Sequence, residues 1–152
     1  MGSLYDQDLV LWAEEQGRAL RAAARAGWNA PIDCENMAEE IDTLGRSERH
    51  ALASHLAAVI EHLLKLQASP ATEPARCRRD TIRRARAEIE RRPEESPGLR
   101  REVTGIIARE NRRTRGLVHA NLQEYGEQPR ADIGVLTYTE APVLGDWLPE
   151  TD

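Results

Sequence analysis

The sequence predicts an all-α fold: an antiparallel helical bundle of about four main helices, over residues 4–26, 33–68, 74–92 and 97–125, with a short C-terminal helical turn and tail packed across it. Apolar residues recur every three or four positions through these segments, as on one face of an amphipathic helix. Glycine, proline and serine residues that commonly cap or end helices stand between the segments. The only alternating stretch, near residues 133–139, is too short to make a sheet.

Capping residues set the limits of the first two helices. Gly27 is a C-terminal stop for the first helix. After a turn at residues 28–31, Asp33 can cap the second helix, with Asn36 three positions further on. An apolar stripe then continues almost to Pro70, which predicts one helix of about 35 residues.

The apolar stripe of this long helix runs from Met37 through Leu44 to Leu66, and Gly45 lies inside it. A glycine in a helix interior costs about 1 kcal/mol relative to alanine. We therefore predict a continuous helix in which another helix packs closely against the Gly45 backbone.

Proline and serine residues mark the last two main helices. The third helix begins near Pro74, a favoured residue in a first turn, and is expected to end before Pro93. Its apolar content is thin. Ser96 caps the fourth helix, which carries a longer apolar stripe and ends at Gly126.

The remaining segment has clustered apolar residues without the length of a full helix. Thr139 can cap a single helical turn, and we expect Trp147 to anchor the tail on the bundle. The sequence shows no repeat and no interdomain linker. With a length typical of one domain, residues 1–152 are predicted to form a single domain.

Composition narrows the class of protein. No apolar run approaches the roughly 18 residues needed to cross a membrane. The first residues lack the features of a secretory signal, so we expect a cytoplasmic protein. Cys34 and Cys77 form no CxxC pair, which excludes a disulfide framework or a zinc knuckle and favours reduced thiols.

Charge is distributed unevenly along the chain. The net charge is −5, yet residues 73–115 are net basic and both flanking segments are net acidic. An arginine-rich helix can follow nucleic-acid phosphates, but no aromatic residues alternate with these arginines to stack on bases. The arginines can instead pair within the fold with the acidic residues Glu35, Glu39 and Asp42. The candidate contacts to nucleic acid or an acidic partner are Arg78, Arg79, Arg83, Arg84 and Arg86.

Three polar residues border the apolar stripe of the second helix. Glu48, His55 and His62 follow one another at steps of seven residues, which places successive members about 10.5 Å apart along the axis. That spacing prevents one helix from delivering all three to one ion, and no helical HxxxH or ExxH pair occurs. We predict no metal site and no cofactor, and expect hydrogen-bonded polar groups. The candidate catalytic residues are Glu39, Glu40, Glu48, His55 and His62.

Residues 35–49, ENMAEEIDTLGRSER, resemble the signature ENLAEEIESLGRSER of the DUF29 family of small bacterial proteins. The resemblance implies an α-helical fold and no assigned activity. Leu66 and Arg78 stand where the family pattern has tryptophan, so an aromatic pocket shared with the family is not expected. Further similar elements are residues 11–16, 62–65, 81–83, 96–100 and 147–150.

These observations together favour a protein-interaction or regulatory module, with a protein partner or a second copy of the chain as its ligand and no membrane contact. The alternative is an enzyme or metal-binding protein that uses the Glu/His seam. A second alternative is weak nucleic-acid binding through the arginine-rich third helix.

Overall fold

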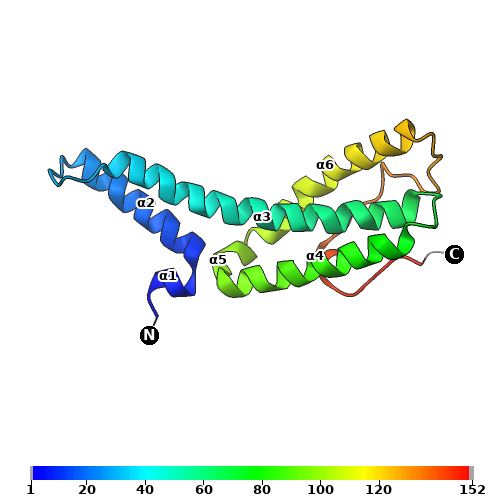
Figure 1. The fold of residues 1–152 in the computed structure, drawn as a ribbon, viewed down its shortest axis with the longest axis horizontal. Coiled ribbons are helices and arrows are strands. Elements are labelled where there is room, and N and C mark those ends of the chain that lie inside the picture. The colour runs from blue at the N-terminus through cyan, green and yellow to red at the C-terminus, as the bar shows by residue number, and fades with distance from the viewer. Residues whose placement is uncertain (1, 151–152) are drawn as a thin grey trace. The chain divides into compact units, whose positions relative to one another are not determined.

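The computed structural model describes residues 2–150 and confirms the all-α prediction. Figure 1 shows long helices and a long irregular segment between the last long helix and the C-terminal helix, and the described residues contain no strand. Nor does any helix in this range combine the length and the apolar character needed to cross a membrane. The helices are α1 (Leu4–Gln7), α2 (Leu9–Arg25), α3 (Cys34–Ala68), α4 (Ala75–Glu95), α5 (Pro97–Arg100), α6 (Val103–Glu124) and α7 (Glu140–Leu144).

The described chain divides into two compact units. The first, here called the hairpin unit, comprises the residues up to Ala51 together with Arg92–Arg101. The second, the bundle unit, comprises Leu52–Arg91 and the residues from Glu102 onward. Helices α3 and α4 each contribute residues to both units.

In the hairpin unit, α2 packs against the first half of α3 through small residues, and Figure 1 shows the two segments side by side. Gly45 is buried, and a Cβ atom built on it would lie 3.7 Å from Cβ of Ala13. A Cβ atom on Gly17 of α2 would lie only 2.5 Å from Oδ1 of Asp42. The predicted close approach of another helix to Gly45 is therefore confirmed.

Ion pairs flank this contact on the side of α3 that faces α2. Arg21 donates to Asp42 at 2.6 Å and to Glu39 at 3.2 Å, and these hydrogen bonds raise the pKa of its guanidinium group. Arg49 of α3 pairs with Glu14 of α2. Because the lower-numbered residues of α2 pair with the higher-numbered residues of α3, the two helices run antiparallel.

The predicted first helix is broken at Asp8, a correction to the range 4–26. Asp8 has an extended backbone, and its carboxylate accepts a hydrogen bond from the Leu11 amide at 3.0 Å, which caps α2. The same carboxylate accepts a hydrogen bond from the Gly98 amide of α5 at 2.6 Å. This buried side chain therefore ends α1, begins α2 and joins both to α5.

Two other helix limits differ from the prediction. The range 97–125 divides into α5 and α6, because α5 is held in the hairpin unit by Gly98 and by the buried Leu99, whereas α6 belongs to the bundle unit. Helix α4 continues past Pro93 to Glu95 instead of ending before the proline. Proline removes one backbone hydrogen bond, and so close to the end of a helix that loss does not stop the last two residues.

The bundle unit has a core of aliphatic side chains from α3, α4 and α6, among them the fully buried Leu56, Leu63 and Ile82. A buried amide joins α6 to the segment that precedes α7. Asn111 donates to the carbonyl of Tyr138 at 2.7 Å and accepts from the Tyr138 amide at 2.9 Å. Both polar groups of this otherwise unpaired backbone are thereby satisfied.

Trp147 is only one of the residues that anchor the tail. Its ring lies 6.3 Å from that of Tyr138 and its carbonyl accepts a hydrogen bond from Arg86 at 2.7 Å, but it is 45% exposed, whereas Val143 is fully buried and Tyr138 nearly so. The tail is also held by these two side chains and by hydrogen bonds from Arg86 of α4 to the carbonyls of Pro142 and Val143.

Substitution of Gly45 tests the packing of α2 on α3. The 3.7 Å distance to Ala13 leaves room for one methyl group, so Gly45→Ala should raise the free energy of unfolding by up to about 1 kcal/mol through helix propensity. Gly45→Leu should lower it by about 1–3 kcal/mol through overpacking. Urea unfolding measures both. The matched control is Gly116→Leu, because no atom lies within 4 Å of a Cβ there. Equal stability of Gly45→Leu and the wild type would contradict the packing role.

Candidate functional site

The arginine cluster predicted to face a partner turns partly inward. Arg78 donates to the carbonyls of Lys65 at 3.2 Å and Ala71 at 3.3 Å, and to Oγ of Ser69 at 3.3 Å. Burial lowers the pKa of its guanidinium group. These acceptors lie in the last turn of α3 and just beyond it, so Arg78 secures the end of that helix.

Arg86 is also structural. Its guanidinium group, buried in the bundle unit, donates to the carbonyls of Pro142 and Trp147, each at 2.7 Å, and of Val143 at 3.1 Å. Burial lowers the pKa of this arginine as well. The charge is therefore used to hold the C-terminal tail against α4.

The other predicted arginines lie nearer the surface. Arg79 is half-buried, whereas Arg83 and Arg84 are exposed, and Arg83 pairs with Asp80 at 3.0 Å one turn away.

The acidic residues expected to pair with the arginine cluster have other surroundings. Glu39 and Asp42 pair with Arg21 of α2, and Glu35 is exposed. For Glu39 and Asp42 the expected pairing is corrected accordingly, because their guanidinium partner comes from the neighbouring helix of the hairpin.

The Glu/His seam of α3 is not gathered into one site. Glu48 lies in the hairpin unit, where it accepts a hydrogen bond from Arg92 at 3.1 Å. His55 and His62 lie in the bundle unit and are half-buried. Nδ1 of His62 is buried and has no hydrogen-bond partner among the described residues. Nowhere between residues 2 and 150 do three His, Cys, Asp or Glu side chains form a group able to hold a metal ion.

The two acidic candidates Glu39 and Glu40 point to different sides of α3. Glu39 faces α2, where it pairs with Arg21. Glu40 is exposed, and no described contact involves its carboxylate. The two carboxylates therefore do not face each other as a pair.

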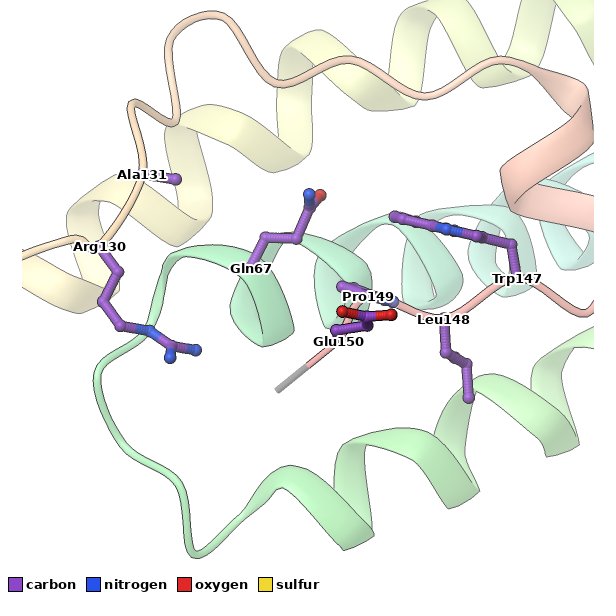
Figure 2. A pocket seen from close by; sticks show the side chains of 7 residues that line it. All are labelled: Gln67, Arg130, Ala131, Trp147, Leu148, Pro149 and Glu150. Carbon is purple, nitrogen blue, oxygen red and sulfur yellow. The ribbon is translucent and has the colours of Figure 1, made fainter. Parts of the chain in front are cut away.

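A cavity of about 680 Å³ lies in the bundle unit, at residues that the sequence did not predict to form a site. Figure 2 shows Arg130 and Trp147 toward opposite ends of this cavity, with Gln67 between them. Arg130 already donates to the Leu66 carbonyl at 3.1 Å, and Gln67 accepts from the Tyr138 hydroxyl. Gln67 and Arg130 belong to no sequence motif, so only the fold brings them together.

An apolar surface of the hairpin unit is open to solvent. Met37 and Leu44, which belong to the apolar stripe of the predicted second helix, are 45% and 38% exposed. From Leu52 onward the same stripe of α3 is fully buried. The hairpin face, as we call this surface, consists of Leu20, Ala23, Trp28, Ile32, Met37, Ile41 and Leu44.

The two helices of the hairpin turn these side chains to the same side. Arg21 and Asp42 meet where α2 contacts α3. Leu20 directly precedes Arg21 in the chain, and Ile41 directly precedes Asp42. One residue corresponds to a rotation of about 100° around a helix axis. Because α2 and α3 are antiparallel, equal rotations from their contact bring both apolar stripes to one side of the pair.

Other residues of the hairpin unit cover only one end of the side of the α2–α3 pair that carries the hairpin face. The ring of Tyr5 packs edge-on against Trp12, with centroids 5.0 Å apart. Arg92 pairs with Glu48 at a corresponding level of α3. Beyond these two contacts, toward the turn between α2 and α3, the apolar side chains remain accessible, and Trp28 is 55% exposed.

Comparison with known proteins supports the fold. The family profile described as Domain of unknown function DUF29 matches residues 4–131. The chain is also similar to the 1.45 Å crystal structure of an α-helical protein of unknown function from Rhodospirillum rubrum, with 23% sequence identity and a TM-score of 0.75. That match covers 96% of this chain and 92% of the other. No curated protein matches the sequence.

Replacement of Arg86 tests whether the arginines act within the fold. Arg86→Gln should lower the free energy of unfolding by about 2–4 kcal/mol, because carbonyl groups of the tail lose a buried charged donor. Arg83→Gln, at an exposed position of the same helix, should change it by less than about 0.5 kcal/mol. Thermal or urea unfolding distinguishes the two variants. Similar small effects would show that Arg86 is dispensable for folding.

The stability of the protein should depend on the protonation of His62. Burial lowers the pKa of this histidine, partly offset by the negative charge of Glu61 and reinforced by Lys65 and Arg78. The unfolded chain therefore takes up the proton at a higher pH than the folded chain. The stability contributed by the neutral, buried His62 is present above about pH 6.5 and is lost as the pH falls below it. His62→Gln should make the free energy of unfolding less sensitive to pH in that acidic range.

The control for this measurement is His119→Gln, because His119 is exposed. It should leave the pH dependence unchanged. If His62→Gln has the same pH dependence as the wild type between about pH 6.5 and 5, the histidine makes no such contribution.

Proposed function

Because the chain belongs to the DUF29 family, whose description assigns no activity, its role has to be inferred from its own surface, and we propose that it is a protein-interaction module that binds through the hairpin face. The observation that carries this proposal is the exposure of Trp28, Ile32, Met37 and Leu44 on one helical hairpin. Clustered exposed apolar side chains are typical of protein-interaction sites, whereas single ones are common on any surface.

The arrangement of the hairpin unit supports the proposal. A helix with an apolar stripe is stable in water when the stripe packs against another layer of structure. In this unit α2 and α3 contact each other through Ala13, Gly17 and Gly45, so their larger apolar side chains are left on the side of the pair. A bound partner would supply the missing layer.

Site-specific photo-cross-linking tests this function. A photoreactive phenylalanine analogue placed at Leu44 should form covalent adducts with a protein partner in cells that produce the chain. The same analogue at Leu117 of α6, which is 51% exposed, is the control and should form few adducts. Addition of Met37→Lys should reduce the adducts at position 44, because a charge on the hairpin face opposes burial. The absence of a difference between positions 44 and 117 would contradict the proposed function.

A further inference from the structure

We infer that the cavity of about 680 Å³ in the bundle unit binds a small zwitterion that carries an aromatic ring, of which a free aromatic amino acid is the simplest example. Small-molecule sites have volumes of about 300–1,000 Å³. The wall of this cavity combines a positive charge on Arg130, a negative charge on Glu150 and the aromatic ring of Trp147. The cavity lies apart from the hairpin face in the chain, and the inference does not depend on the proposed function.

Arg130 provides a place for the carboxylate of the ligand. Its Nη2 atom donates to the carbonyl of Leu66 at 3.1 Å, and its backbone amide donates to the carbonyl of Ala68 at 2.7 Å. These two hydrogen bonds hold the residue at the end of α3. Among the described residues, no group accepts a hydrogen bond from its other guanidinium nitrogens. A guanidinium group held in this way can bind a carboxylate with its remaining donors.

Gln67 contributes a second donor to the cavity. The hydroxyl of Tyr138 donates to Oε1 of Gln67, and burial raises the pKa of this tyrosine, so the hydroxyl keeps its proton. The Gln67 amide is therefore oriented with its oxygen occupied and its nitrogen available. No described residue accepts a hydrogen bond from that nitrogen. Arg130 and Gln67 thus both favour a ligand that presents an acceptor such as a carboxylate.

Glu150 requires a positive charge on the same ligand. Its side chain is exposed, and no described cation pairs with its carboxylate. Figure 2 shows Glu150 between Arg130 and Trp147. A purely anionic ligand would be repelled by Glu150, and a purely cationic ligand would be repelled by Arg130. A ligand with both an ammonium and a carboxylate group satisfies both side chains.

Trp147 provides the apolar end of the cavity. Its indole lies 6.3 Å from the ring of Tyr138, which is nearly fully buried, yet Trp147 itself is 45% exposed. The neighbouring Leu148 and Pro149 extend the apolar wall. Another aromatic ring can pack on this indole in an offset or edge-on arrangement.

The order of these groups matches the structure of an aromatic amino acid. In Figure 2 the cavity is lined in turn by Arg130, Glu150 and Trp147. In an aromatic amino acid the carboxylate and the ammonium group share one carbon, and the ring follows on the side chain. The carboxylate can therefore meet Arg130 while the ammonium group meets Glu150 and the ring meets Trp147. Water fills the part of the cavity that such a ligand leaves open.

Nuclear magnetic resonance titration of the isotopically labelled full chain tests the inference. The indole N–H signal of Trp147 is the one that disappears in Trp147→Phe. L-phenylalanine should shift this signal with a Kd of about 0.1–1 mM, as expected for a ligand of this size. Phenethylamine lacks the carboxylate and phenylpropanoate lacks the ammonium group, so each should bind about three- to tenfold more weakly. L-alanine, which lacks the ring, should bind at least about tenfold more weakly.

Two substitutions test which side chain recognises which charge. Arg130→Gln should remove the preference for phenylalanine over phenethylamine and keep the preference over phenylpropanoate. Glu150→Gln should have the opposite effect on the two preferences. Arg113→Gln and Glu124→Gln, at exposed positions of α6, are the matched controls and should keep both preferences.

A third substitution separates the charge of Arg130 from its structural contact. Arg130→Lys keeps the positive charge but not the planar group that binds both the Leu66 carbonyl and a ligand. It should keep most of the preference for phenylalanine over phenethylamine. Circular dichroism verifies that each variant is folded.

The outcomes decide the site and the ligand class separately. The absence of a shift of the Trp147 signal at about 10 mM L-phenylalanine would overturn the site. Equal binding of phenylalanine and either singly charged probe to the wild type would overturn the zwitterion as its ligand. Loss of both preferences in both variants would overturn the assignment of the two charges. None of these results would affect cross-linking at Leu44, so the proposed function stands or fails by its own test.

A result that supports the inference is a crossed one. The wild type prefers phenylalanine over both singly charged probes, and each variant loses only the preference that belongs to its own side chain.

Discussion

The close contact between α2 and α3 is the constraint from which the character of the hairpin unit follows. Ala13, Gly17 and Gly45 bring the two backbones together, and little apolar area separates them. Large side chains cannot lie in such a narrow contact. The larger apolar residues of each helix therefore lie beside the contact between α2 and α3. The exposure of Met37 and Leu44 is therefore a consequence of how α2 packs on α3.

The bundle unit is stabilised differently. Its core consists of leucine, isoleucine and valine side chains that fill the space between α3, α4 and α6. Arginines close its edges: Arg78, Arg86 and Arg130 each donate to backbone carbonyls at the end of α3 or in the C-terminal tail. Guanidinium groups suit this role because they present several donors in one plane. These three arginines are thus used inside the fold.

The sequence predicted the long helices because their periodicity is a local property, and Gly45 was identified because a glycine within an apolar stripe requires a close neighbour. The break at Asp8 was not predictable, since the same aspartate is compatible with a continuing helix until Gly98, far along the chain, binds its carboxylate. The arginine cluster posed the same difficulty, because charge alone does not distinguish a guanidinium group that meets phosphate from one that meets a carbonyl of the tail. For the hairpin face, a stripe of apolar residues indicates that other side chains pack on that side of a helix. It does not indicate whether those side chains belong to the same chain. On α3 the pattern is continuous, yet Leu52 is fully buried and Leu44 is not.

The buried Asp8 has a consequence for the order of folding. Its hydrogen bond with the Gly98 amide joins residues that are neighbours in space but separated in the chain by the whole of α3 and α4. During synthesis, the N-terminal helices emerge long before the segment that secures them. The hairpin unit therefore reaches its complete form only after the residues between its two parts have been made, so its assembly is tied to a loop closure of high contact order.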